Sequence, residues 1–326
     1  MKAFLIWNPA AGSADFHHHL TEGIHSLERW GWQVECAATA ARGDATRLAR
    51  ECAQQGYDVA IAVGGDGTIN EVVNGLVGSD TALGVIPAGT ANVYAADVGI
   101  PIWSHLHPHA VSEAASIIHT GQRRRLDLGR VQLKDGRERY FFMWCGIGLD
   151  AAITHEVRSE DTRRMGYLAW IIASIMVAVN FMGHGGRVTM GGKRRRWRLL
   201  WVVVSNGQLY GRLWRIAPTA KMDDGLLDVT VFEGYGILST IRHILGLTLG
   251  FHMRDPRVHH ERCSSVLVRT RKPLPVHVDA EPIGNTPVHV SVVPRAITVI
   301  LPPRLPMHVL SHQDEQQEAV QEMTTV

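Results

Sequence analysis

The sequence predicts an α/β N-terminal domain with a parallel sheet, followed by an all-β C-terminal sandwich domain. The first part of the chain alternates short apolar segments with stretches of helical periodicity, which is typical of βαβ units. From about residue 128 the pattern changes to alternating apolar and polar residues between Gly, Pro and Asp turns, which indicates antiparallel strands. Small-residue turns end several segments of the first part, where open parallel sheets bind ligands.

Length and composition are those of a globular protein of enzyme size. The chain has 326 residues, and 45% of them are hydrophobic, which is enough for one large or two medium domains. A net charge of +2 gives no field that would by itself bind nucleic acid, so no nucleic-acid partner is expected. Four widely spaced cysteines without a CxxC pair, and a start without a signal-type apolar core, favour a cytoplasmic location.

The first predicted βαβ unit begins with a strand at residues 3–7. Its carboxyl end runs into a turn of small residues, namely Asn8, Pro9, Ala10, Ala11 and Gly12. Ser13 either faces a phosphate group or caps the next helix, and both functions suit its hydroxyl. A second strand at residues 32–39 ends at Thr39, and a helix over residues 44–55 completes the unit.

Residues 59–76 contain the central motif, which reads as a strand, a tight glycine turn and a helix. The turn and the start of the helix consist of Gly64, Gly65, Asp66, Gly67, Thr68, Ile69 and Asn70. Glycines allow a ligand to approach the backbone closely, and the first N–H groups of a helix attract anions. A phosphate therefore suits this corner, and Asp66 is placed to hold a metal beside it. An ordinary glycine-rich βα turn is the alternative.

A second turn of the same kind follows the next predicted strand, Ala82–Pro87. It reads PAGTAN over residues 87–92 and includes Thr90. Because the carboxyl ends of neighbouring parallel strands share one edge of the sheet, the two turns should lie side by side, which strengthens the phosphate interpretation. A helix at residues 112–120 follows, and a domain boundary is expected near Asp127.

The second part of the chain carries two groups of acidic residues. Its predicted strands cover residues 139–144, 197–204, 226–232, 265–269, 275–278 and 288–293. The stretch Asp223-Asp224-Gly225 is either a hairpin turn or a site for a hard cation. Asp279 and Glu281 share one face if the last short strand continues through them, and a turn would splay them apart. As a pair of acids they suggest general-base catalysis.

Three further segments bear on location and partners. The apolar run at residues 167–182 is too short to span a bilayer, so a core helix or an interfacial helix that lines a lipid entrance is expected. Residues 193–196, Lys-Arg-Arg-Arg in a predicted hairpin tip, either rest on anionic headgroups or form a solvated face. The polar residues 311–326 predict a mobile tail.

The set of motifs resembles the diacylglycerol kinase catalytic-domain family, which includes bacterial YegS-like lipid kinases, sphingosine kinases and ceramide kinases. The similarity follows the family's order up to about residue 303. GGDGT alone also occurs in NAD kinases and phosphofructokinases, so the whole set carries the resemblance. Its motifs are NPAAG (8–12), GGDGTIN (64–70), PAGTAN (87–92), CGIGLDA (145–151), DDGLLDV (223–229) and DAE (279–281).

The resemblance implies two domains with ATP bound between them. An NAD kinase-like α/β domain would comprise residues 1–127 with residues 294–310 returning to it, and the sandwich would comprise residues 128–293. The residues implied to bind ATP are Asn8, Pro9, Ala10, Ala11, Gly12, Thr39, Gly64, Gly65, Asp66, Gly67, Thr68, Ile69, Asn70 and Thr90.

The resemblance also implies the chemistry. Glu281, assisted by Asp279, would take the proton from the lipid hydroxyl that attacks the γ-phosphate, with Asp66 and a catalytic Mg²⁺ beside it. A second, structural Mg²⁺ would be held by the Asp224 carboxylate and by main-chain oxygens of Lys221 and Leu226. The lipid is left open among diacylglycerol, sphingoid bases, ceramide and phosphatidylglycerol.

Two departures from the family pattern keep other functions open. Val93 stands where many members have an aspartate of the magnesium water network, and Ala280 replaces the glycine of the usual DGE motif. An NAD kinase-like small-molecule kinase, or a catalytically weak regulatory module that binds nucleotide or lipid, are the alternatives. The expected partners are ATP, a lipid substrate and a membrane surface to which the chain associates peripherally, with a homodimer allowed for.

Overall fold

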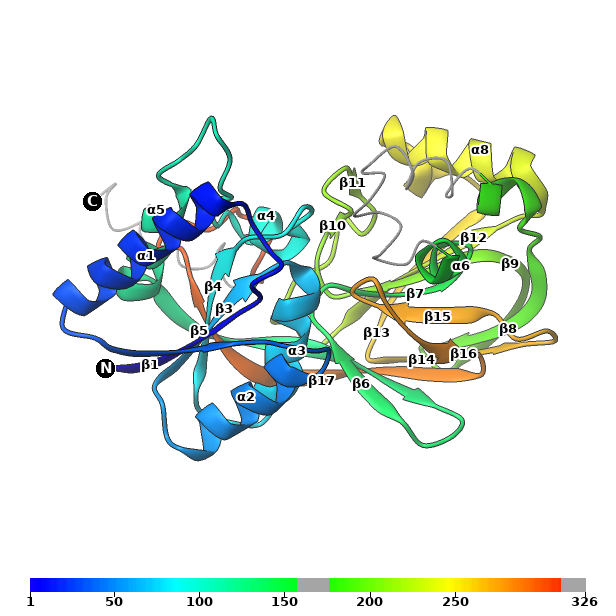
Figure 1. Ribbon diagram of the computed structural model, residues 1–326. Coiled ribbons are helices and arrows are strands. Elements are labelled where there is room, and N and C mark those ends of the chain that lie inside the picture. The colour runs from blue at the N-terminus through cyan, green and yellow to red at the C-terminus, as the bar shows by residue number, and fades with distance from the viewer. Residues whose placement is uncertain (157–175, 312–326) are drawn as a thin grey trace, which may run out of the picture.

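The computed structural model describes residues 1–156 and 176–311, and its first part is an α/β domain with a parallel sheet (Figure 1). The strands are ordered β2-β1-β3-β4, and each neighbouring pair is parallel, so the predicted fold class is confirmed. Its elements are β1 (Lys2–Trp7), α1 (Ala14–Arg29), β2 (Gln33–Ala38), α2 (Asp44–Gln54), β3 (Val59–Gly64), α3 (Asp66–Leu76), β4 (Ala82–Pro87), α4 (Val93–Val98) and α5 (Ala110–Thr120).

The strand order places helices on both faces of this sheet. β2 and β3 flank β1 on opposite sides, so right-handed crossovers put α1 on one face and α2 on the other. α1 packs against α5, and α2 packs against α3. All six residues of β3 are buried, which explains why its sequence is an unbroken run of apolar and small residues.

The remainder of the chain is rich in antiparallel strands that enclose a second core. Val131, Val202, Val229 and Val290 lie in it without solvent exposure. Its elements are β5 (Gln122–Leu133), β6 (Glu138–Phe141), β7 (Trp144–Gly148), α6 (Leu149–Glu156), β8 (His184–Met190), β9 (Lys193–Ser205), β10 (Leu209–Tyr210), β11 (Trp214–Arg215), β12 (Leu227–Glu233), α8 (Gly236–Thr248), the 3₁₀ helix η1 (His252–Arg254), β13 (Val258–Cys263), β14 (Ser265–Thr270), β15 (Pro275–Val278), β16 (Glu281–Asn285) and β17 (Val288–Leu301).

Strands β5 and β17 belong to both parts of the molecule. They pair antiparallel along their length, with a bulge between Val293 and Ile297. Beyond the bulge, β17 runs parallel to β4 and extends the first sheet. Asp127, near which the sequence places a boundary, lies inside β5 and is fully buried. Its carboxylate accepts bonds from the backbone N–H groups of Arg295 at 2.8 Å and Gly225 at 2.6 Å, and thereby fixes the bulge.

Several observed elements differ from the sequence-based expectations, and two of the segments singled out in the sequence fall largely or wholly beyond the described residues. The single strand predicted at residues 139–144 is instead two strands, β6 and β7, interrupted at Phe142 and Met143, whose N–H groups bond the side chain of Asp279 in the turn between β15 and β16. Helices α6 and α8 were not predicted. Most of the apolar run at 167–182, and the tail after residue 311, lie outside the described residues. Within the described part of the chain, no helix is long and apolar enough to cross a bilayer.

Candidate functional site

The carboxyl ends of four strands lie together at one edge of the parallel sheet. Backbone N–H groups of Asn8, Thr39 and Ala88 bond the carbonyls at the ends of neighbouring strands, at distances of 2.9–3.0 Å. The chain adds β2 on one side of β1 and β3 on the other, so the strand order reverses direction between β1 and β3. Ligands of open α/β folds bind at such a switch point. The structure therefore brings the predicted turn residues at 8–12, 39, 64–70 and 90 to one edge.

The turn after β1 is shaped by local hydrogen bonds. Asn8 Oδ1 accepts a bond from Ala10 N at 2.9 Å, and Gly12 has a φ of +81°, a conformation that glycine adopts without strain. Ser13 accepts a bond from Phe16 N at 3.2 Å and is the N-cap of α1. Of the two functions considered for Ser13, capping is the observed one.

The turns after β3 and β4 touch backbone to backbone. A Cβ atom on Gly89 would lie 2.4 Å from Gly65 Cα, so this contact requires glycine. Asn92, buried and in the left-handed conformation with a φ of +49°, bonds both the N–H and the carbonyl of Gly89. Gly67, at the start of α3, has nothing within 4 Å of where a Cβ atom would lie, which leaves the main chain there open to a ligand.

Asp66 lies at the start of α3, where these turns meet. Its carboxylate is partly buried and accepts a bond from Tyr94 N at 3.3 Å. Burial raises the pKa of Asp66 to about 6, and the nearby negative charge of Asp279 contributes to the rise. Val93, where relatives in this family were expected to have an aspartate, is 2% exposed and packs into the core, so it offers no oxygen to a ligand.

Asp279 connects the two parts of the molecule. It comes from the turn between β15 and β16, is 4% exposed, and accepts a bond from the Asn70 side chain of α3 at 2.8 Å. Its two oxygens also accept the N–H groups of Phe142, Met143 and Trp144 at 2.7–3.0 Å. Burial raises the pKa of Asp279, while these bonds oppose the rise. Hydrogen bonds to four donors make this carboxylate a structural connection as well as a candidate catalytic group.

The paired acids are splayed by a turn, which is one of the two arrangements considered from the sequence. Asp279 and Ala280 have φ values of +44° and +65° and form a two-residue hairpin connection. Ala280 therefore holds a left-handed conformation in which the family's glycine would be relaxed. His277 Nδ1 accepts the Ala280 N–H at 3.2 Å, and its Nε2 bonds Asp150 of α6.

Glu281 meets arginines from two distant segments. Arg139 of β6 bonds one carboxylate oxygen at 2.7 Å, and Arg42, which precedes α2, bonds the other. The Glu281 side chain is 21% exposed, and that of Arg42 is 66% exposed. A carboxylate, two guanidinium groups and a glycine-lined edge thus lie within reach of one another, an arrangement suited to holding an anionic ligand beside a base.

The second predicted metal site has suitable oxygens but an occupied carboxylate. Asp224 accepts a bond from Leu226 N at 3.0 Å and forms an ion pair with Arg262. Carboxylate and carbonyl oxygens suit Mg²⁺, but a cation at Asp224 would compete with the Arg262 guanidinium. Lys221 directs its ammonium group to the carbonyls of Met307 and Leu310. Across the described ranges, no three His, Cys, Asp or Glu side chains are grouped as metal ligands.

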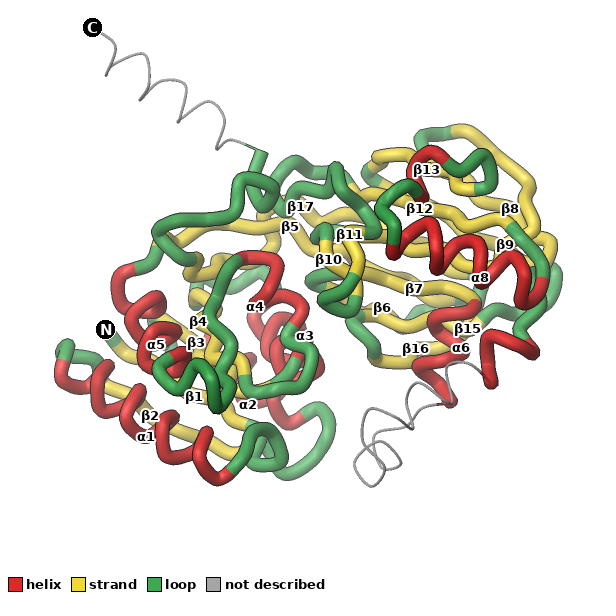
Figure 2. Tube along the Cα trace, turned by 90° about the horizontal axis from the view of Figure 1, so that it is seen from above, coloured by secondary structure: helices red, strands yellow, loops and turns green. Residues whose placement is uncertain are grey.

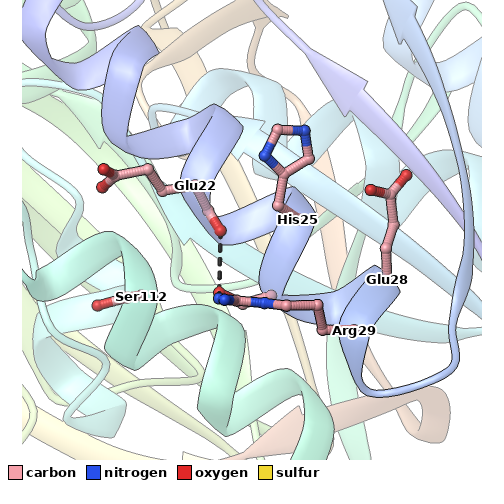
Figure 3. A pocket seen from close by; sticks show the side chains of 6 residues that line it. Glu22, His25, Glu28, Arg29 and Ser112 are labelled. Atoms are coloured by element: carbon pink, nitrogen blue, oxygen red, sulfur yellow. Dashed lines mark hydrogen bonds between the residues drawn. The ribbon is translucent and has the colours of Figure 1, made fainter.

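A surface hollow elsewhere on the molecule is lined by none of the predicted site residues. It lies between α1 and α5, and the side chains around it are exposed or half-buried (Figure 3). It is lined by Glu22, His25, Ser26, Glu28, Arg29 and Ser112. The predicted site residues line the strand ends instead, so the candidate site is at the sheet edge.

Comparisons with known proteins agree with this architecture. Residues 2–131 match the family model described as diacylglycerol kinase catalytic domain, and residues 144–301 match the YegS C-terminal NAD kinase beta sandwich-like domain. The chain therefore belongs to the YegS-like diacylglycerol kinase family.

Individual relatives extend this similarity over nearly the whole chain. This chain is 29% identical over 303 residues to a diacylglycerol kinase of Bacillus subtilis, and the alignment covers 92% of this chain and 96% of the relative. A diacylglycerol kinase of Staphylococcus saprophyticus is 29% identical over 289 residues, with 88% and 90% covered. The crystal structure of a diacylglycerol kinase from Bacillus anthracis has a TM-score of 0.74 at 26% identity, and covers 93% of this chain and 97% of its own. These relatives support a kinase.

Four polar residues of the site were not predicted individually. Asp150 lies in the quoted CGIGLDA motif and His277 lies two positions before Asp279, so local sequence offered a signal for both. Arg42 and Arg139 gave no such signal, because they reach Glu281 across 239 and 142 positions of the sequence.

The raised pKa of Asp66 predicts a pH-dependent effect on stability. The folded chain binds the Asp66 proton more tightly than the unfolded chain, so its stabilising contribution is complete below pH 3.8 and is lost as the pH rises through about 6. Relative to wild type, Asp66→Asn should raise the free energy of unfolding by up to about 3 kcal/mol near pH 8 and hardly change it near pH 4. Urea unfolding across this range measures the difference, and Asp80→Asn, at a fully exposed side chain, is the control. A difference that shrinks with rising pH would contradict the prediction.

Proposed function

We propose that the protein is an ATP-dependent lipid kinase that transfers the γ-phosphate to the hydroxyl of diacylglycerol or a related lipid. One observation carries this proposal: glycine-lined strand ends that suit phosphates are tied, through Asn70 and Asp279, to a hairpin that presents a second carboxylate. Membership of the YegS-like diacylglycerol kinase family supports it. Such an enzyme would act in phospholipid metabolism.

In the proposed reaction, ATP lies along the strand ends at residues 8–12, 39, 64–70 and 90. The backbone N–H groups of these turns and the start of α3 would bind its phosphates. Arg42 and Arg139 would exchange part of their contact with Glu281 for the phosphates, so that the carboxylate becomes free to act. Mg²⁺, held through Asp66, would neutralise phosphate charge.

Glu281 is proposed as the general base of phosphate transfer. The lipid hydroxyl oxygen forms a bond to the γ-phosphorus, the bond from that phosphorus to the bridging oxygen of ADP breaks, and the hydroxyl proton passes to Glu281. Asp279 would position this base, because its bonds to Asn70 and to the β6–β7 backbone fix the hairpin on which Glu281 lies. Asp150 and His277 flank the same hairpin and are candidates for contacts to the acceptor.

The substrate is tested by incubating the protein with γ-labelled ATP and separate candidate acceptors. Diacylglycerol, ceramide, sphingosine, phosphatidylglycerol and NAD⁺ are each supplied, and the lipids are presented in detergent micelles. Label is expected in one of the lipids. Label in NAD⁺ alone would show a small-molecule kinase, and label in none, together with measurable ATP binding, would show a regulatory module, for which the buried Val93 is the argument.

Replacing the proposed base tests the mechanism. Glu281→Gln keeps the size of the side chain but cannot take the proton, so turnover should fall by about 10²–10⁴-fold. ATP affinity, measured by calorimetry, should be kept or increased, because Arg42 and Arg139 lose a competing charge. Glu51→Gln, which removes the surface pair with Arg47, is the control. Turnover near that of wild type in Glu281→Gln would reject the assignment.

The second, structural Mg²⁺ site is proposed at Asp224, with main-chain oxygens of Lys221 and Leu226. Equilibrium dialysis should find about one fewer bound Mg²⁺ in Asp224→Ala than in wild type, because the only charged ligand of the site is gone. Asp80→Ala, at a fully exposed position, should leave the stoichiometry unchanged. Equal stoichiometry in Asp224→Ala and wild type would assign this carboxylate to Arg262 alone.

A further inference from the structure

Exposed apolar side chains gather on one region of the β-rich part. Of fifteen large exposed apolar side chains in the described ranges, only Met1, Trp30, Leu106 and Met307 lie elsewhere. Trp214 Nε1 bonds Thr248 Oγ1 at 3.2 Å, which sets the β10–β11 hairpin beside α8. The eleven exposed apolar side chains of this region are Met176, Val179, Met182, Leu213, Tyr235, Leu238, Ile241, Ile244, Leu245, Leu249 and Phe251.

Helix α8 is the centre of this region. Its large apolar side chains face solvent, whereas those of an ordinary surface helix face the core. Most of its buried positions are small or polar, namely Gly236, Ser239, Thr240, His243 and Gly246, with Leu247 the exception. Its outward positions include Leu238, 80% exposed, and Leu245, 52% exposed. A helix of a globular protein normally turns its apolar side to the core. The apolar face of α8 therefore fits a partner that is apolar itself.

The exposed face of α8 carries no acidic residue. Residues 234–254 include Arg242 and Arg254 but no Asp or Glu, and Arg242 pairs with the buried Asp255 just beyond this stretch at 2.6 and 2.8 Å. An amphipathic helix of apolar and basic composition is typical of segments that lie in the interface of an anionic bilayer.

A row of arginines lies on the same sheet as the strands beneath α8. Arg187 of β8 is directly opposite Arg196 of β9 and Arg269 of β14, so three like charges cross three neighbouring strands. The charges of Arg194 and of these neighbours lower the pKa of Arg187. Like charges opposite each other destabilise a sheet, so this arginine row, Arg187, Arg196 and Arg269, has a cost that an anionic partner would offset.

The arginine row and α8 are connected on one face. Arg198, two positions along β9 from Arg196 and hence on the same face, lies 4.2 Å over the ring of Tyr235, which immediately precedes α8. Figures 1 and 2 both show α8 lying across the outer side of β9 and β12.

We propose that the apolar face of α8 and the arginine row form one surface that docks on an anionic phospholipid bilayer. The α8 side chains would enter the headgroup region, and the arginines would contact lipid phosphates. This inference rests on the proposed function, since the substrate of a lipid kinase is in a membrane. A second copy of the chain is the less suitable partner, because it would bring an equally basic surface without acids to meet it.

Vesicle binding tests this surface. One variant combines Leu238→Gln, Leu245→Gln and Leu249→Gln, and its control changes the exposed Trp30, Leu106 and Met307 to Gln. A second variant combines Arg187→Gln, Arg196→Gln and Arg269→Gln, and its control changes the exposed Arg50, Arg123 and Arg124 to Gln. Co-sedimentation is measured with phosphatidylcholine vesicles that contain phosphatidylglycerol.

The two variants should lose binding for different reasons. The arginine variant should bind about 100-fold more weakly, and the leucine variant at least about 10-fold, while both controls bind as wild type does. The arginine variant should also melt no lower than wild type, because the repulsion in the row is removed. Unchanged vesicle binding in the leucine variant would overturn the proposal. In particular, if the wild type is a dimer and the leucine variant is a monomer that still binds vesicles, the apolar face of α8 is a contact between two copies of the chain.

A soluble substrate separates this proposal from the proposed function. Both variants should phosphorylate a short-chain, water-soluble diacylglycerol at the wild-type rate, because the changed residues lie outside the candidate site. Absence of that activity in the wild type would count against the lipid kinase while vesicle binding still tests the docking surface. Loss of the activity in the variants alone would place α8 or the arginine row in the catalytic machinery, and would overturn a role restricted to docking.

Discussion

The carboxylate of Asp279 is the interaction on which the candidate site depends. It accepts the Asn70 side chain from the α/β domain and three consecutive backbone N–H groups from the segment between β6 and β7. Burying a carboxylate with fewer hydrogen bonds would cost free energy of folding, so Asp279 requires these four donors. The donors in turn have Asp279 as their hydrogen-bond acceptor. The phosphate-binding edge and the hairpin that carries Glu281 are thereby held in one geometry, and a disturbance at either would reach the other.

Much of the fold follows from local pattern, and the parts that do not have identifiable causes. The buried strand β3 and the glycines after it predict the central motif without tertiary information. The interruption between β6 and β7 was not predictable, because its cause is a side chain more than 130 positions away. Helix α8 escaped prediction although its periodicity is visible. Its apolar positions face outward, which is the opposite of what ordinary amphipathic helices lead one to expect.

The same distinction applies to the site. Turn residues at strand ends could be predicted together, because a parallel sheet brings the carboxyl ends of its strands to one edge. Whether Asp279 and Glu281 share one face could not be predicted, because it depends on whether the backbone turns at residues 279–280. They do so even though Ala280 is not glycine, which indicates that the hairpin is imposed by its surroundings, including the bond from Ala280 N to His277. Arg42 and Arg139 contact Glu281 only through the tertiary fold.

Strands β5 and β17 also limit how the molecule can move. Many enzymes of two domains open about a flexible linker, but here two paired strands continue from one part into the other. A hinge across them would break ladder hydrogen bonds, so large opening would resemble local unfolding. The bulge at 293–297 is where the ladder is already interrupted, and Asp127 restrains it. The two parts of the molecule can therefore move mainly by twisting the continuous sheet that joins them. Access of a ligand to the strand ends would depend on the loops and helices around them more than on separation of the two parts.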